Sequence, residues 1–114
     1  MKSGPKTRKM FLERAKKAIP LGVNSNFRYW GDKETLIVKK GDGGYLYDQD
    51  DNRYIDYRLG FGPVILGHAD PGVHDAVVEA MKIGNAFAMT HEYEIEAAEK
   101  IKKLTGVDLV RFAN

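Results

Sequence analysis

The chain has 114 residues, 43% of them hydrophobic, with 18 Lys and Arg against 16 Asp and Glu and no cysteine. This length allows one modest hydrophobic core, and the lack of cysteine excludes disulfides and thiolate metal sites within the chain. No apolar run approaches the roughly 20 residues of a membrane span, and no apolar segment follows the basic first ten residues as it would in a secretory signal, so we expect a cytoplasmic protein with no membrane partner.

Charge is distributed unevenly along the chain. Residues 1–40 carry eleven Lys or Arg and three acids, whereas residues 41–114 carry seven and thirteen. A basic arm can contact nucleic-acid phosphates, but no aromatic side chains interleave with these lysines to stack on bases. We therefore favour a solvated amphipathic helix and expect no nucleic-acid partner.

The first predicted element is a helix that begins after Thr7, a good N-cap, and ends before Pro20. Its expected buried stripe consists of Phe11, Ala15, Ala18 and Ile19. The next eleven residues, 21–31, show neither a helical nor a strand period. Because they combine aromatic side chains, small polar groups and Arg28, they are typical of a loop that binds a ligand or packs tightly.

Three short antiparallel strands are predicted next, at residues 35–39, 44–48 and 53–57, with alternating apolar side chains. Residues 41–44 and 50–52 are rich in Gly, Asp and Asn, which favour turns. The acidic stretch 48–52 superficially resembles a calcium loop. It lacks the glycine and the bidentate glutamate that such loops require, so we interpret it as a hairpin turn.

A glycine-flanked bend at residues 60–63 places Phe61 between two glycines and leads toward a helix. Asp70 suits the N-cap of this helix, Pro71 its first position, and Gly84 the residue after its end. A second helix is predicted at residues 91–104, ended by Gly106, and an apolar strand at residues 107–112. Helix, helix and apolar strand begin an α/β unit, and a lone strand needs neighbours, so we expect the chain to be part of a larger protein.

Two groups of residues are candidate sites. His68, Asp70 and His74 fit no known metal spacing, so we expect no metal and a turn carbonyl as the partner of His68. Ser25, Arg28 and Phe61 form the other group: arginine can hold a carboxylate in a bidentate fork, and an aromatic ring can line a planar ligand. The residues alone leave this binding site and a packed loop equally open.

Four sequence blocks, taken together and in order, resemble one enzyme family. They read GVNS-x-x-R at residues 22–28, YL-x-D-x-D-x-x-RYIDY at 45–57, GP-x-ILGHA-x-P at 62–71 and VRF-x-N at 110–114. In this order they resemble the N-terminal portion of the class III aminotransferases of fold type I. Within that family they are most similar to the glutamate-1-semialdehyde 2,1-aminomutase group.

The resemblance implies an α/β fold: an N-terminal helix and three-stranded antiparallel meander, then the start of the large domain that binds pyridoxal 5'-phosphate. Residues 1–70 would belong to the small domain and residues 71–114 to the large one. The resemblance further implies a homodimer, with residues 84–91 near the dimer interface. The cofactor would be bound mainly beyond this chain, because Asn114 precedes the position of the phosphate-cradling turn and the Schiff-base lysine lies further on.

By the same resemblance, Ser25 and Arg28 would hold the substrate carboxylate and Phe61 would line the substrate pocket. No catalytic, cofactor-binding or metal-ligating residue is expected in the chain itself. Two departures matter: Asn26 and Phe27 stand where the aminomutases have Pro and Val, and Phe61 stands where they have Trp. An aminomutase-like enzyme is therefore expected, with a two-substrate aminotransferase of different amino-acid specificity and a non-catalytic interaction fragment as alternatives.

Overall fold

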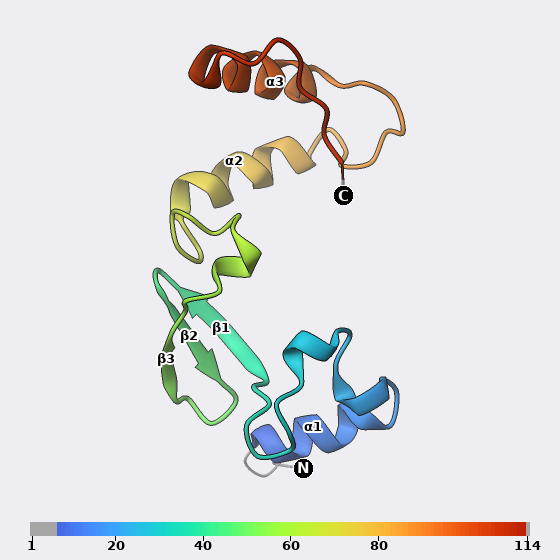
Figure 1. The fold of residues 1–114 in the computed structure, drawn as a ribbon, viewed down its shortest axis with the longest axis vertical. Coiled ribbons are helices and arrows are strands. Elements are labelled where there is room, and N and C mark those ends of the chain that lie inside the picture. The colour runs from blue at the N-terminus through green and yellow to red at the C-terminus, as the bar shows by residue number, and fades with distance from the viewer. Residues whose placement is uncertain (1–6, 114) are drawn as a thin grey trace. The chain divides into compact units, whose positions relative to one another are not determined.

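The computed structural model describes residues 7–113, so Asn114 lies outside the described residues. The chain divides into two compact units, Met1–His74 and Asp75–Asn114, which are considered separately (Figure 1). The division falls four residues after the domain boundary that the resemblance implies. The assignment of the two parts to a small and a large domain stays a prediction.

Helix α1 (Arg8–Lys16) begins as predicted, because the Thr7 hydroxyl accepts a hydrogen bond from the Met10 N–H at 3.4 Å. The predicted stripe missed its main member, Leu12, which is only 2% exposed, whereas Phe11 is half-buried and Ala18 is exposed. The reason lies in the short 3₁₀ turn η1 (Pro20–Gly22), which folds back on α1. A β-carbon on Gly22 would lie 2.9 Å from Leu12, so the bare glycine backbone covers that side chain.

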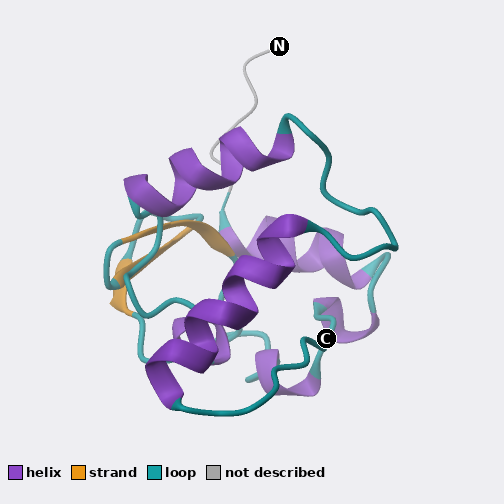
Figure 2. Ribbon diagram, turned by 90° about the horizontal axis from the view of Figure 1, so that it is seen from above, coloured by secondary structure: helices purple, strands orange, loops and turns teal. Residues whose placement is uncertain are grey.

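The meander is confirmed as one antiparallel sheet of order β1-β2-β3, and the strands in Figure 2 are confined to it. The strands are β1 (Val38–Asp42), β2 (Tyr45–Asp48) and β3 (Arg53–Ile55). The predicted position of the first strand, residues 35–39, was wrong. Gly41 pairs with Leu46, so only Gly43 and Gly44 form the turn.

Thr35, predicted to begin the first strand, is instead a buried residue of the preceding loop. Its hydroxyl donates to the Gly31 carbonyl at 2.8 Å and accepts from the Trp30 N–H at 3.0 Å. These bonds to the backbone on either side of the Trp30–Gly31 peptide hold the end of the 21–31 loop in place.

The hairpin turn between β2 and β3 is organised by Asp48, which is 2% exposed. Its carboxylate accepts hydrogen bonds from the Asp50 and Asn52 N–H groups, the Asn52 side chain and the Tyr54 hydroxyl, at 2.9–3.0 Å. Burial opposes ionisation, but the bonds from Asn52, Asp50 and Tyr54 outweigh it and lower the pKa of Asp48. This carboxylate is occupied by its own turn, as the hairpin interpretation of residues 48–52 requires.

Helix α2 (Pro71–Met81) begins as predicted, with the Asp70 carboxylate accepting from the Val73 N–H at 2.9 Å. Helix α3 (Glu92–Thr105) is capped by His91, whose Nδ1 accepts from the Tyr93 N–H at 3.2 Å. Gly106, in the left-handed conformation with φ +77°, ends α3. The helices of this part of the chain are therefore confirmed.

The predicted strand at residues 107–112 is not formed. A strand needs a hydrogen-bonding neighbour, and residues 75–113 contain no other strand that could provide one. Leu109, one of the apolar residues that suggested a strand, is 89% exposed, so the described residues do not bury its side chain.

Candidate functional site

The two residues expected to bind a carboxylate lie close together in the sequence. Arg28 is the last residue of the 3₁₀ turn η2 (Asn26–Arg28), and Ser25 immediately precedes this turn. The Ser25 carbonyl accepts the Arg28 N–H at 2.9 Å, which fixes their relative backbone position. Ser25 is half-buried and Arg28 is exposed. Among residues 7–113, no hydrogen bond or ion pair joins the Arg28 side chain to Ser25 or to any carboxylate.

Phe61 lies on a strained turn. The turn η3 (Leu59–Phe61) and the following Gly62 all have positive φ, including +47° for Leu59 and +68° for Phe61. Residues other than glycine rarely adopt this backbone conformation, and such strain concentrates at functional sites. The ring of Phe61 is 69% exposed, so it is presented outward and not packed into the unit 1–74.

Arg58, which the sequence analysis did not single out, connects these two segments. Its guanidinium carbon lies 4.7 Å from the ring centroid of Trp30 and 5.5 Å from that of Phe61. Cation–π attraction acts over such distances. Arg58 thus links the 21–31 loop to the Phe61 turn, a contact that no local sequence pattern reveals.

The base of the Phe61 turn is fixed by Asp56, whose side chain is 4% exposed. One carboxylate oxygen accepts the N–H groups of Arg58 at 2.8 Å and Leu59 at 3.2 Å, and the other lies 2.7 Å from Nε2 of His68. The hydrogen bond with His68 and those from the two backbone N–H groups outweigh burial and lower the pKa of Asp56. The expectation of a carbonyl partner for His68 was wrong, because a buried carboxylate is a stronger acceptor.

His68 is held on the hairpin by its backbone as well as by Asp56. Its N–H donates to the Gly43 carbonyl at 2.7 Å, and its carbonyl accepts the Gly43 N–H at 2.9 Å. Its ring lies against Gly41, where a β-carbon would come within 2.4 Å of Cγ. Asp56 and His68 therefore join the sheet to the turn that carries Phe61.

Two of the three residues considered for a metal site have other roles. Asp70 caps α2 and His68 pairs with Asp56. Within residues 7–113 no group of three or more His, Asp or Glu is arranged to hold an ion. Across the same residues, no helix is long and apolar enough to cross a membrane.

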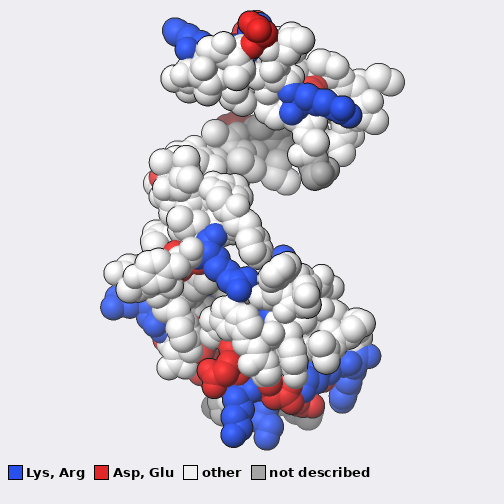
Figure 3. Space-filling view, in the orientation of Figure 1, with Lys and Arg blue, Asp and Glu red and all other residues white. Residues whose placement is uncertain are grey.

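The lysines of the described residues do not fit the role of a Schiff-base lysine, which needs a depressed pKa and shelter from water. Lys16 is half-buried, but its 2.6 Å contact with the Asp32 carboxylate raises its pKa, which is the opposite direction. The other lysines in this part of the chain are exposed. Figure 3 shows basic and acidic side chains intermingled on the unit that contains α1. Lys39 and Asp51, 2.6 Å apart, form one ion pair of this unit.

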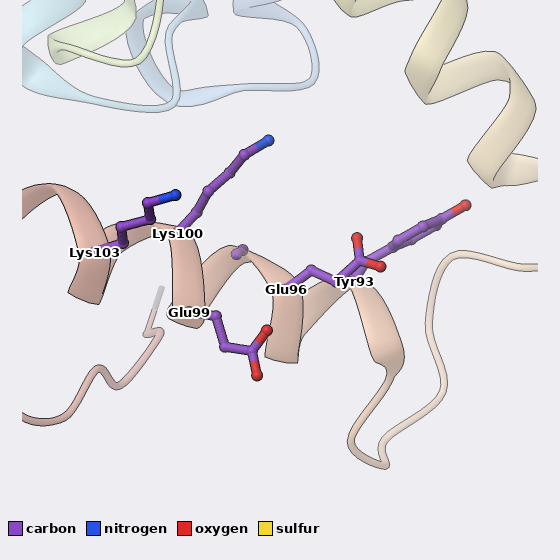
Figure 4. Close-up of a pocket in the computed structure, with 6 residues that line it drawn as sticks. Tyr93, Glu96, Glu99, Lys100 and Lys103 are labelled. Atoms are coloured by element: carbon purple, nitrogen blue, oxygen red, sulfur yellow. The ribbon is translucent and has the colours of Figure 1, made fainter.

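One hollow, of about 520 Å³, lies along α3 alone (Figure 4). It is lined by Tyr93, Glu96, Ala97, Glu99, Lys100 and Lys103. These side chains come from one helix and carry both signs of charge, and no other element of the described residues lines the hollow. This hollow is the open side of a helix, so the Ser25–Arg28 turn, Arg58 and Phe61 remain the candidate site.

Known proteins resemble this chain over most of its length. Residues 28–114 match the model of the aminotransferase class-III family. The chain is 46% identical over 107 residues to the glutamate-1-semialdehyde 2,1-aminomutase of Thermoplasma volcanium, an alignment that covers 93% of this chain and 25% of the relative. The chain thus spans about a quarter of the length of the curated relatives it matches.

Two solved structures have a similar fold. A β-phenylalanine aminotransferase from Variovorax paradoxus gives a TM-score of 0.83 at 25% identity, covering 94% of this chain and 25% of that one. A transaminase solved with bound pyridoxal phosphate gives a TM-score of 0.70 at 29% identity, covering 82% of this chain and 22% of that one. A similar architecture therefore forms part of two solved aminotransferases.

Proposed function

Because this chain belongs to the class III aminotransferase family, we propose that it supplies part of the substrate-binding region of a pyridoxal-phosphate enzyme. The enzyme resembles glutamate-1-semialdehyde 2,1-aminomutase and moves an amino group on a carboxylate-bearing substrate. The observation that carries this proposal is the 46% identity to an aminomutase across 93% of the chain. The exposed guanidinium of Arg28, on the matched loop, supports it.

In this proposal Arg28 binds the substrate carboxylate. A guanidinium presents parallel N–H groups that match the two oxygens of a carboxylate. Among the described residues no acid occupies this side chain, so its donors are available. Ser25, held one turn away by its backbone bond to Arg28, adds a hydroxyl, and the outward-facing ring of Phe61 forms an apolar wall.

Pyridoxal phosphate, when bound, supplies the electron sink that makes amino transfer feasible. The residues described here do not include a lysine fit to hold it, so we propose that the cofactor is bound mainly by parts of the enzyme outside this chain. The partners of the chain would then be the remainder of the same enzyme and a second subunit in a homodimer. What this chain contributes is binding and orientation of the substrate.

A two-substrate aminotransferase is the second candidate. By the resemblance of the sequence blocks, Phe61 stands where the aminomutases have Trp, and the β-phenylalanine aminotransferase shares the fold with a TM-score of 0.83. The two candidates differ in stoichiometry. An aminomutase forms product from one substrate alone, whereas an aminotransferase needs an oxo-acid acceptor, so product formation by the purified enzyme with and without added acceptor separates them.

The role of Arg28 is tested by replacing it with Ala and with Lys in the complete enzyme. Losing a charge-assisted fork costs about 1.5–3 kcal/mol of binding, so Arg28→Ala should raise KM for acid substrates about 10–150-fold. The absorbance of the bound cofactor should stay unchanged in both variants. An unchanged KM in a folded, cofactor-loaded Arg28→Ala enzyme would remove Arg28 from the site.

A further inference from the structure

Arg58 is, after Arg28, the second cation of the candidate site without a carboxylate partner among residues 7–113. The ion pairs of this part of the chain use Lys16, Lys39, Lys40, Lys82 and His68. The nearest acid in the sequence, Asp56, accepts the backbone N–H of Arg58 at 2.8 Å and directs its other oxygen to His68. The side-chain charge of Arg58 is therefore left unneutralised.

Aromatic rings, not acids, hold this guanidinium. It lies over Trp30 at 4.7 Å and over Phe61 at 5.5 Å. Contact with an aromatic ring engages the flat face of a guanidinium and leaves the N–H donors around its edge available. An arginine held in this way keeps both its charge and its capacity to bind a carboxylate in a fork.

The position of Arg58 links it to the substrate. If Phe61 lines the pocket, a ligand that touches its ring comes close to a guanidinium whose carbon lies 5.5 Å from the ring centroid. We propose that Arg58 determines specificity by binding a second carboxylate of the substrate, so that the enzyme prefers amino substrates with two carboxylates. This inference rests on the proposed function and assigns the second anionic group to Arg58, with the first at Arg28.

The test compares two ligands that differ only in one charge, glutarate and its monoamide glutaramate. Their dissociation constants are measured by calorimetry on the complete, cofactor-loaded enzyme. The wild type should bind glutarate more tightly, and Arg58→Leu should reduce this preference about 10–100-fold. Arg58→Lys, which keeps the charge but loses the fork, should retain part of the preference.

Arg53→Leu is the matched control. Arg53 also lies over an aromatic ring, Tyr45, at 4.6 Å, but on the sheet and not beside Phe61. Its loss should leave the preference for glutarate unchanged. Thermal unfolding of both leucine variants checks the fold, and Arg58→Lys supplies the result if Arg58→Leu fails to fold.

Equal binding of both ligands by the wild type, or equal weakening of both by Arg58→Leu, would overturn the proposal. A failure of the proposed function would give a different pattern of dissociation constants. Arg28→Ala should weaken both ligands, because both keep the carboxylate assigned to Arg28. If Arg28→Ala changes neither ligand while Arg58→Leu removes the preference, the role of Arg28 fails and that of Arg58 stands.

Discussion

Replacing Gly41 by alanine should destabilise the protein by displacing His68. The added β-carbon would lie 2.4 Å from Cγ, 2.7 Å from Cβ and 2.8 Å from Nδ1 of the His68 side chain. Ordinary contacts of this kind are about 3.5–4.0 Å, so the ring would have to move by roughly 1 Å. It has little freedom to do so, because its backbone is paired with Gly43 and its Nε2 lies 2.7 Å from Asp56.

The expected loss of folding stability follows from the two ways in which the clash can be relieved. If the ring shifts in place, the strain costs about 1–3 kcal/mol. If the ring leaves, a hydrogen bond to a buried carboxylate is lost, at about 1.5–3 kcal/mol. Restriction of the unfolded chain by alanine offsets about 0.4–1 kcal/mol, so we expect a net loss on the order of 1–2 kcal/mol.

Gly44→Ala provides the matched control in the same hairpin. A β-carbon on Gly44 meets no atom within 4 Å, and its φ is not in the left-handed region. This variant should be neutral or up to about 1 kcal/mol more stable. The assay is thermal unfolding of the complete enzyme, in which 1 kcal/mol corresponds to about 2–4 °C for a domain of about 150–250 residues. Equal melting temperatures for the two variants would refute the reasoning.

Three further predictions concern the site and its support. Phe61→Trp should change substrate preference and leave cofactor retention intact, as measured by kcat/KM across amino substrates and by cofactor absorbance; a loss of stability alone would make Phe61 a packing residue. Because the pKa of Asp56 is lowered by folding, its stabilisation is present above its unfolded pKa of about 3.9 and is lost as the pH falls through the folded value. Unfolding measured from pH 7 down to pH 2 should therefore be less pH-dependent in Asp56→Asn than in the wild type, and parallel curves would contradict this. The 114-residue chain alone, mixed with pyridoxal phosphate and reduced with borohydride, should show only sparse labelling scattered over its lysines by mass spectrometry; one stoichiometrically labelled lysine would overturn the assignment of the Schiff base to another part of the enzyme.

Three helix boundaries were predictable because their signals are local, whereas α1 ends at Lys16, before the predicted end next to Pro20. Thr7, Asp70 and Gly106 each act on backbone groups within four residues, so their roles can be recognised from the sequence alone. The meander was predictable for the same reason, since its turns consist of adjacent Gly, Asp and Asn.

The features that could not be predicted from the sequence depend on contacts between residues that lie far apart in the chain. Gly41 looks like a turn residue, yet it lies in β1 and its missing side chain makes room for the ring of His68. Arg58 looks like any residue at a strand end, and only folding brings it to Trp30. The prediction of a strand at residues 107–112 was wrong. Its apolar pattern implies a neighbouring strand to pair with, and residues 75–113 contain none.

The way in which the Phe61 turn is attached affects how easily the substrate preference of such an enzyme can be altered. Strand β3 ends at Ile55, and Asp56 ties the next turn to His68 through its carboxylate. Arg58 and Phe61 therefore project from a small loop whose anchorage does not depend on their side chains. Side chains at these two positions can be exchanged without disturbing the strands, so a combinatorial library restricted to 58 and 61 should yield mostly folded enzymes with altered selectivity.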